Sequence, residues 1–184
     1  MQNEPPSQDI VGLGPPLSEM PWSADFVMQA IEILPVTLRD EEHLALRPKH
    51  AESYIVGWPA GARPEEVAAR AIKQLGMEPI ILHSTSWRHD GTEVVLSYLA
   101  VVSATTEAPP SWEAAPIGHV ELARGDATTP PSSIGSLQVL EHALRHLSWL
   151  MKDDPVVARA IPEWQEFLDD YTPEPFRAFG APGG

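Results

Sequence analysis

The sequence has no cysteine among its 184 residues. This absence excludes disulfide bonds, thiolate metal ligands and thiol nucleophiles. Basic side chains are also scarce: 12 Lys and Arg stand against 26 Asp and Glu, which leaves a formal net charge of -14 at pH 7. A charge of this sign repels phosphate groups. We therefore expect neither nucleic acid nor a membrane surface among the partners.

Long apolar runs are missing as well. No stretch reaches the ~18 to 20 apolar residues that cross a bilayer, and the first residues lack the basic start and apolar run of a signal peptide. We therefore expect a cytoplasmic protein. Proline and glycine are frequent at both ends, which predicts flexible tails at 1–21 and 172–184 around a single domain at 22–171.

Several segments have the pattern of strands. Residues 30–38 are apolar and β-branched, although Pro35 cannot donate to a sheet and indicates an edge strand or a bulge. A polar turn and the alternating residues 43–49 complete a predicted hairpin. Further strands are expected at 54–58, as a short buried strand, and at 79–87 and 93–102, as the longest strand pair.

One helix is predicted over residues 65–75. Pro64 suits its first turn, two glutamates follow at the positive end of the helix dipole, and Gly76 ends it. Its apolar residues form a single stripe that one face of a sheet can bury; they are Val67, Ala68, Ala71, Ile72 and Leu75.

The last third of the chain has a helical pattern. Residues 134–151 carry apolar side chains at spacings of three and four and thus present a wide apolar face. Asp154 and Pro155 begin another helix, which Pro162 interrupts. The predicted fold class is therefore α+β, with a mixed β-sheet, flanking helices and a helical C-terminal third.

This order of elements resembles the Nudix hydrolase fold over roughly residues 30–103. The segments that carry the resemblance are GWPAGARPEEVAARAIKQLGMEP, at the position of the family's signature loop and helix, and LHSTSWRHDGTEVVLSYLAVV, at its following strands. The resemblance implies an α/β/α sandwich with a mixed sheet. It also implies a magnesium ion, bound by helical glutamates, that activates water on a diphosphate.

The helical glutamates of that motif are replaced in this sequence. Anchoring the motif at Gly76 and Met77 places Arg70, Lys73 and Gln74 at the acidic positions. Shifting the alignment by one residue, so that Arg70 takes the motif arginine, places Ala71, Gln74 and Leu75 there instead. Because a magnesium ion needs oxygen ligands, we expect a domain that has lost the usual chemistry and binds no cofactor.

The segment HSTSWRHDG contains the densest polar cluster at the end of an apolar strand. Regular alternation would place His83, Thr85 and Trp87 on one face and Ser84, Ser86 and Arg88 on the other. We predict that ligand contacts come from this stretch, with candidates His83, Ser84, Ser86, Trp87 and Arg88. The alternative is a strand end whose hydroxyls are hydrogen-bonded within the fold and whose Trp is partly buried.

His142 and His146 lie one helical turn apart, a spacing with which a zinc pair can begin. Two ligands do not make a site, and the sequence has neither an HExxH motif nor a cysteine to complete it. We therefore expect these histidines on a helix surface or an interface, and no bound metal.

Three functions follow from these patterns. The first is a non-catalytic Nudix-like binding or regulatory domain with a small-molecule ligand. The second is a divergent magnesium-dependent hydrolase of a nucleoside-diphosphate-like substrate that uses Glu65, Glu66 or Glu93. The third is a structural homo-oligomer without any small ligand.

A homodimer is expected from the wide apolar face of residues 134–151, which has Trp149 on its flank. A small domain has little core with which to cover such a face. The alternative is that residues 155–171, which include Trp164 and Phe167, fold back over that helix and leave no apolar face for a second chain.

Overall fold

A computed structural model describes residues 28–90, 93–120, 122, 134–175 and 177–179, without the side chains of Met28, Asp90 and residues 177–179. The elements in chain order are β1 (Met28–Arg39), β2 (Glu42–Pro48), β3 (Tyr54–Gly57), α1 (Pro64–Gln74), β4 (Pro79–Asp90), β5 (Glu93–Val102), β6 (Trp112–Pro116), α2 (Ser136–Asp153), α3 (Pro155–Ala160), the 3-10 helix η3 (Pro162–Trp164), α4 (Gln165–Asp169) and β7 (Arg177–Phe179).

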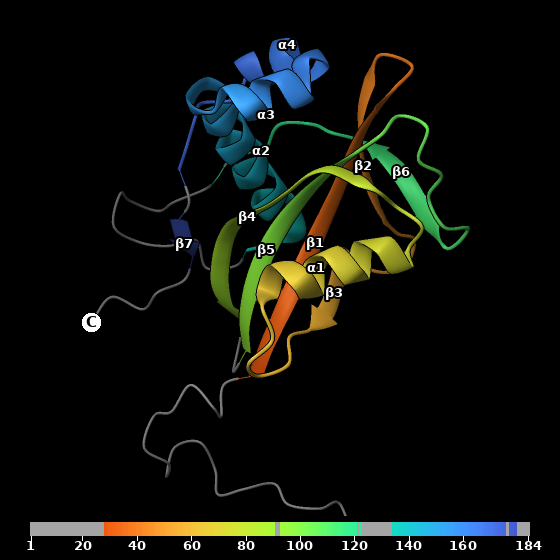
Figure 1. Ribbon diagram of the computed structural model, residues 1–184, viewed down its shortest axis with the longest axis vertical. Coiled ribbons are helices and arrows are strands. Elements are labelled where there is room, and N and C mark those ends of the chain that lie inside the picture. The colour runs from red at the N-terminus through yellow and green to blue at the C-terminus, as the bar shows by residue number, and fades with distance from the viewer. Residues whose placement is uncertain (1–27, 91–92, 121, 123–133, 176, 180–184) are drawn as a thin grey trace, which may run out of the picture.

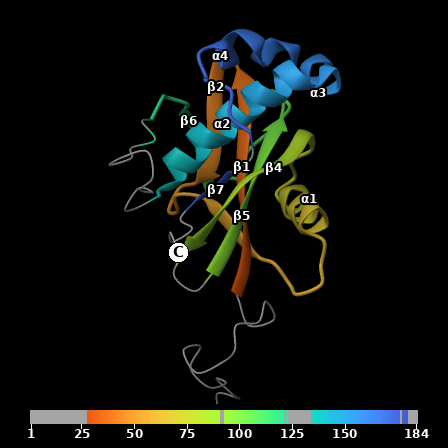
Figure 2. The same cartoon turned by 90° about the vertical axis from the view of Figure 1, so that its left-hand side faces the viewer.

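The strands form one mixed sheet in the order β6-β2-β1-β5-β4-β7, and β3 pairs with β1. Strands β1 and β5 run parallel at its centre. Helix α1 covers one face of the sheet, whereas α2 with α3 and α4 lies on the other (Figures 1 and 2). The predicted α+β class, with a mixed sheet, flanking helices and a helical C-terminal third, is confirmed.

The two predicted tails differ in how much of each the structure describes. Residues 1–21 lie outside them. The other segment, 172–184, contains β7, which pairs in parallel with Ser86, Trp87 and Arg88 of β4. Among the described residues, no helix is both long enough and apolar enough to cross a membrane.

Helix α1 forms for the reasons that its sequence predicts. Pro64 stands in its first turn, Glu65 and Glu66 follow, and Gly76 adopts a φ of +75° just beyond its end. Glycine is favoured there because other residues are strained at positive φ. The apolar stripe packs on the sheet: Ala68, Ala71 and Ile72 are buried.

The predicted hairpin is formed by β1 and β2, but Pro35 is not at a sheet edge. Strand β1 is interior, since it pairs with β5 along one side and with β3 and β2 along the other. The backbone N–H of Trp58 donates to the Gln29 carbonyl at 2.9 Å, so alternation turns the Pro35 nitrogen toward the β3 and β2 side. There it falls between Ile33, which pairs with β3, and Val36, which pairs with β2. The missing N–H therefore costs no bond to β5.

Strand β3 is less buried than expected. Its side chains alternate between half-buried and exposed positions, and Ile55 is 48% exposed. The reason is its position: β3 pairs only with β1.

A β-bulge in β4 overturns the predicted alternation of residues 83–88. The register with β5 shifts between Ser84 and Ser86, so that Ser84 is opposite Tyr98 and Ser86 is opposite Ser97. Consecutive residues of β5 face opposite sides of the sheet. Ser86 and Arg88 consequently share the α2 face with His83, whereas Ser84 and Trp87 face the α1 side.

The C-terminal helices fold back over α2. Asp154 caps α3, because its Oδ1 accepts a hydrogen bond of 2.7 Å from the Val156 N–H. Trp164, Leu168 and Tyr171 are buried in the same core as Leu144 and Leu147 of α2; their exposed fractions do not exceed 2%. The segment 155–171 thus packs over α2, and the expected homodimer stays a prediction.

Candidate functional site

A buried row of polar side chains crosses the α2 face of the sheet. Glu32, Ser97 and Ser86 are in register on β1, β5 and β4, and each is at most 1% exposed. Arg88 Nη1 donates to Glu32 Oε2 at 2.5 Å and to Ser97 Oγ at 3.3 Å, and Ser97 Oγ donates to Glu32 Oε2 at 2.9 Å. We call Glu32, Arg88, Ser97 and Ser86 the polar cluster. Glu32 Oε1 and Ser86 Oγ have no hydrogen-bond partner among the described residues.

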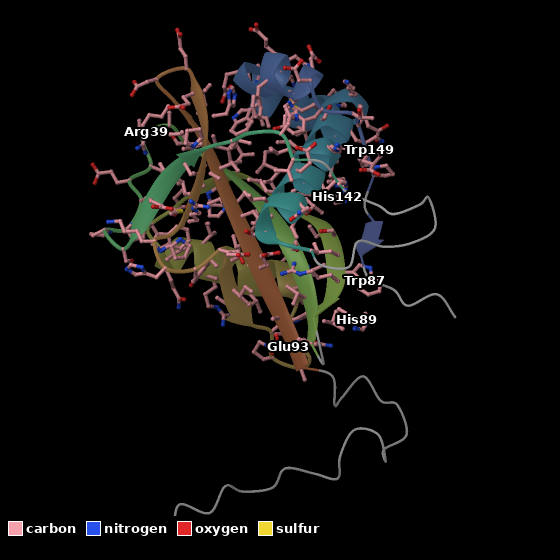
Figure 3. All side chains as sticks on the ribbon, turned by 180° about the vertical axis from the view of Figure 1, so that it is seen from behind. Arg39, Trp87, His89, Glu93, His142 and Trp149 are labelled. Carbon is pink, nitrogen blue, oxygen red and sulfur yellow. The ribbon has the colours of Figure 1, made fainter. Side chains whose placement is uncertain are left out.

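The other candidates from 83–88 lie apart from this cluster. The His83 ring stacks on that of His146, with 5.1 Å between the ring centroids. Trp87 meets His89 edge to face at 5.5 Å, and Figure 3 shows this pair toward one end of the sheet, away from His142 on α2. The five predicted residues thus do not form a single site.

His142 and His146 are not on the surface, since they are 0% and 2% exposed. The C-terminal segment covers them: His142 Nδ1 lies 3.4 Å from Glu174 Oε2, and the Glu174 N–H donates to the Arg145 carbonyl at 3.0 Å. Burial lowers the pKa of both rings, and with the nearby His83 and His142 it lowers the pKa of His146 to about 4. No group of three or more metal-ligating side chains occurs among the described residues.

The surface of α1 carries few groups suited to a metal. Arg70, Lys73 and Gln74 are exposed. Glu65 and Glu66 both form ion pairs with Arg63, and a backbone hydrogen bond together with Arg63 lowers the pKa of Glu65.

A cleft opens where β1 and β2 separate. The ladder between these strands ends at Val36 and Ala45, on the C-terminal side of Pro35. Beyond that point the space of about 180 Å³ is bounded by β1, β2, residues 115–118 and the start of α2. An adjoining space of about 240 Å³ continues along the first turn of α2. None of the predicted residues 83–88 lines either space.

The cleft has an apolar floor and a polar rim. Leu34, Leu46 and Leu140 line it and are at most 8% exposed. The rim carries Arg47, Glu52, Ser53 and Ser136. Sequence patterns do not reveal this site, because its members belong to five separate segments; the only local signal is Pro35, which interrupts a strand.

The charged groups of the rim are fixed to different extents. Arg47 Nε donates to Glu113 Oε1 at 2.8 Å across the β2–β6 pair, and both side chains are about 40% exposed. Glu52 forms no hydrogen bond or ion pair with another described residue. It lies beside the start of α2, 3.9 Å from the position that a Cβ on Gly135 would take. The first turn of α2 has no acidic residue of its own, so Glu52 supplies the negative charge that a helix start favours.

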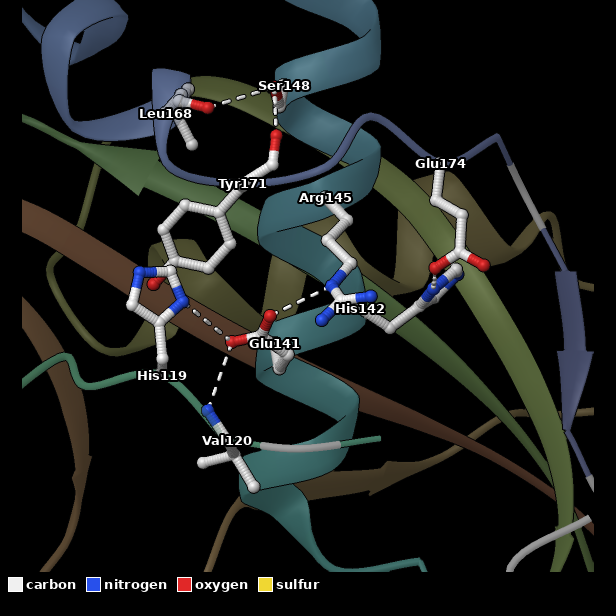
Figure 4. A network of polar contacts seen from close by, with 9 residues as sticks. All are labelled: His119, Val120, Glu141, His142, Arg145, Ser148, Leu168, Tyr171 and Glu174. Carbon is white, nitrogen blue, oxygen red and sulfur yellow. Dashed lines mark hydrogen bonds and ion pairs between the residues drawn. The ribbon is translucent and has the colours of Figure 1, made fainter. Parts of the chain in front are cut away.

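A second polar network fastens the C-terminal segment to α2 (Figure 4). Glu141 is 3% exposed and accepts hydrogen bonds from Arg145 Nε at 2.8 Å and from the Val120 N–H at 3.2 Å. Ser148 Oγ lies within 3.0 Å of the Leu168 carbonyl and 3.1 Å of the Tyr171 carbonyl. Burial, together with Glu141, raises the pKa of Tyr171. Each of these hydrogen bonds joins two residues of this chain, so we assign the network a structural role.

Comparison with known proteins adds no relative to these observations: the chain matches no protein-family model, and no curated protein is significantly similar to it.

Proposed function

We propose that the protein is a non-catalytic binding or regulatory domain that takes a small molecule in the cleft between β1, β2 and the start of α2. The observation that carries this proposal is the combination of a buried apolar floor with a polar rim at the place where two strands separate. Small-molecule sites have this composition, in which apolar walls supply affinity and a few polar groups fix the orientation.

The chemistry of α1 supports a non-catalytic role. The resemblance to the Nudix family assigns metal-binding glutamates to positions that hold Arg70, Lys73 and Gln74 here. Of the acids that a divergent hydrolase could use, Glu65 and Glu66 are paired with Arg63. A magnesium ion would compete with that guanidinium for both carboxylates. A Nudix-like domain without the metal-binding glutamates is therefore our proposal, and the divergent hydrolase is the alternative.

A ligand screen with two matched variants tests the proposed site. Leu137 is 53% exposed and lines both parts of the cleft, whereas Val156 is 63% exposed on α3 and lines neither. Leu137→Trp should obstruct the cleft, and Val156→Trp should add the same bulk elsewhere. Compounds that raise the melting temperature of the wild type should do so for Val156→Trp but not for Leu137→Trp. Equal binding to all three proteins would show that the ligand binds elsewhere and would refute the cleft as the binding site.

The absence of catalysis has a separate test. Phosphate release from a panel of nucleoside diphosphate derivatives is expected to stay at background with magnesium present. Turnover that a chelator abolishes would overturn the non-catalytic assignment and favour the hydrolase, with Glu65→Gln, Glu66→Gln and Glu93→Gln as the variants that locate its metal.

A further inference from the structure

We infer that the ligand of this cleft is a free α-amino acid with an apolar side chain. This inference rests on the proposed function, because it names the ligand class of the same cleft. It is carried by two opposite charges that border one apolar space.

The two charges are Arg47 and Glu52, which line both parts of the cleft. Arg47 donates to Glu113 through Nε, and its terminal nitrogens make no hydrogen bond to another described residue. A guanidinium in this state can bind a carboxylate. Glu52 is exposed and unpaired among the described residues, so its carboxylate can accept hydrogen bonds from an ammonium group. A zwitterion satisfies both groups at once.

The apolar floor of the cleft determines which kind of side chain the ligand carries. Leu34 and Leu140, which belong to the core beneath α2, and Ala45, which packs against that core, offer a hydrocarbon surface, which suits an aliphatic or aromatic side chain. This floor belongs to the part of the cleft of about 180 Å³, and the adjoining part of about 240 Å³ is bordered by Arg47, Glu52 and the first turn of α2.

Charge also disfavours a purely anionic ligand. Arg47 is the one basic residue among those that line the described cleft, and it already has Glu113 as a partner. A diphosphate would bring several negative charges next to Glu52 and Glu113 in a chain of net charge -14. An amino acid brings no net charge.

Calorimetry with L-leucine and L-phenylalanine tests the inference on the full chain. N-acetyl-L-leucine lacks the ammonium charge, and L-leucinamide lacks the carboxylate. We expect each derivative to bind about tenfold or more weakly than L-leucine, because each leaves one rim charge without its partner.

Variants connect each charge with one end of the ligand. Arg47→Met should weaken L-leucine and remove its advantage over L-leucinamide, and Glu52→Gln should remove its advantage over N-acetyl-L-leucine. Lys49→Met and Glu42→Gln remove the same charges from residues of this region that do not line the cleft, and should bind like the wild type. Melting curves establish that each variant is folded.

The outcomes separate the ligand class from the site. One outcome is that neither amino acid binds at millimolar concentration, while another compound binds to the wild type and not to Leu137→Trp. The amino-acid class would then be wrong, and the cleft would remain the binding site. If L-leucine binds equally to Leu137→Trp, both the site and this inference fail. Discrimination that persists unchanged in Arg47→Met and Glu52→Gln would also overturn the inference.

Discussion

Glu32 on β1 and Arg88 on β4 form an ion pair across the intervening strand β5, with 2.5 Å between Oε2 and Nη1. The two side chains are 1% and 9% exposed and come from positions 56 residues apart. Ser97 of β5 bonds to both of them. Three strands are thus joined by side-chain contacts in addition to their backbone ladders.

Removing the cation of this pair should destabilise the protein strongly. Arg88→Met leaves a buried carboxylate without its counter-charge, for which we expect a loss of about 3 to 5 kcal/mol in the free energy of unfolding. The double variant Glu32→Leu with Arg88→Met removes both charges and should regain much of that loss. Urea denaturation measures both. A single variant as stable as the wild type, or a double variant less stable than the single one, would contradict this account.

The sequence predicts most elements of this fold because their causes are local. Helix α1 follows from Pro64, its apolar stripe and Gly76, and α3 follows from Asp154 and Pro155. Each signal lies within one turn of the element that it sets. Such patterns are legible without knowledge of any distant contact.

The candidate site could not be predicted in the same way. One extra residue at Thr85 moves Ser86 and Arg88 to the other face, and no glycine or proline marks that bulge. The cleft depends on where β2 leaves β1, which is a property of two strands together. Pro35 was visible as an anomaly, but the choice between an edge strand and a change of partner strand depends on the position of β3.

Stability should fall in mild acid because of His146. Burial and two neighbouring histidines lower its pKa from 6.5 to about 4 in the folded state. Below pH 6.5 the unfolded chain binds a proton that the folded chain does not, so stability is lost as the pH falls from 6.5 to 4, by roughly 3 kcal/mol in total. His146→Phe should reduce this loss. Identical pH dependence of the urea midpoint in both proteins would refute the assignment.

A substitution at Trp164 tests how much the C-terminal helices that cover α2 contribute to stability. It is 1% exposed in the core that α2 shares with the C-terminal helices, so Trp164→Ala should cost about 3 to 5 kcal/mol. It should also uncover part of the apolar face and raise the mass measured by light scattering. An unchanged stability would show that the cover contributes little. A wild-type mass of two chains would support the dimer predicted from the sequence, through a different surface.

The β1–β2 turn offers a stabilising substitution. Asp40 and Glu41 adopt φ values of 51° and 65°, a region that favours glycine and asparagine. Asp40→Asn with Glu41→Gly gives the sequence that such turns prefer, and we expect a gain of about 1 kcal/mol in urea denaturation. Ala60→Gly, in the loop before α1, is the control and should give no gain. A destabilised turn variant would contradict the assignment of strain to these two residues.

The two sides of the sheet are completed at different times during translation. Among the described residues, the hydrophobic layer beneath α1 runs from Ile31 to Trp112, whereas the layer beneath α2 extends to Tyr171. Because a nascent chain leaves the ribosome from its N-terminus, the first layer is fully synthesised well before the second. One apolar face of the sheet, with the Glu32 and Arg88 charges on it, therefore stays uncovered until the last helices emerge.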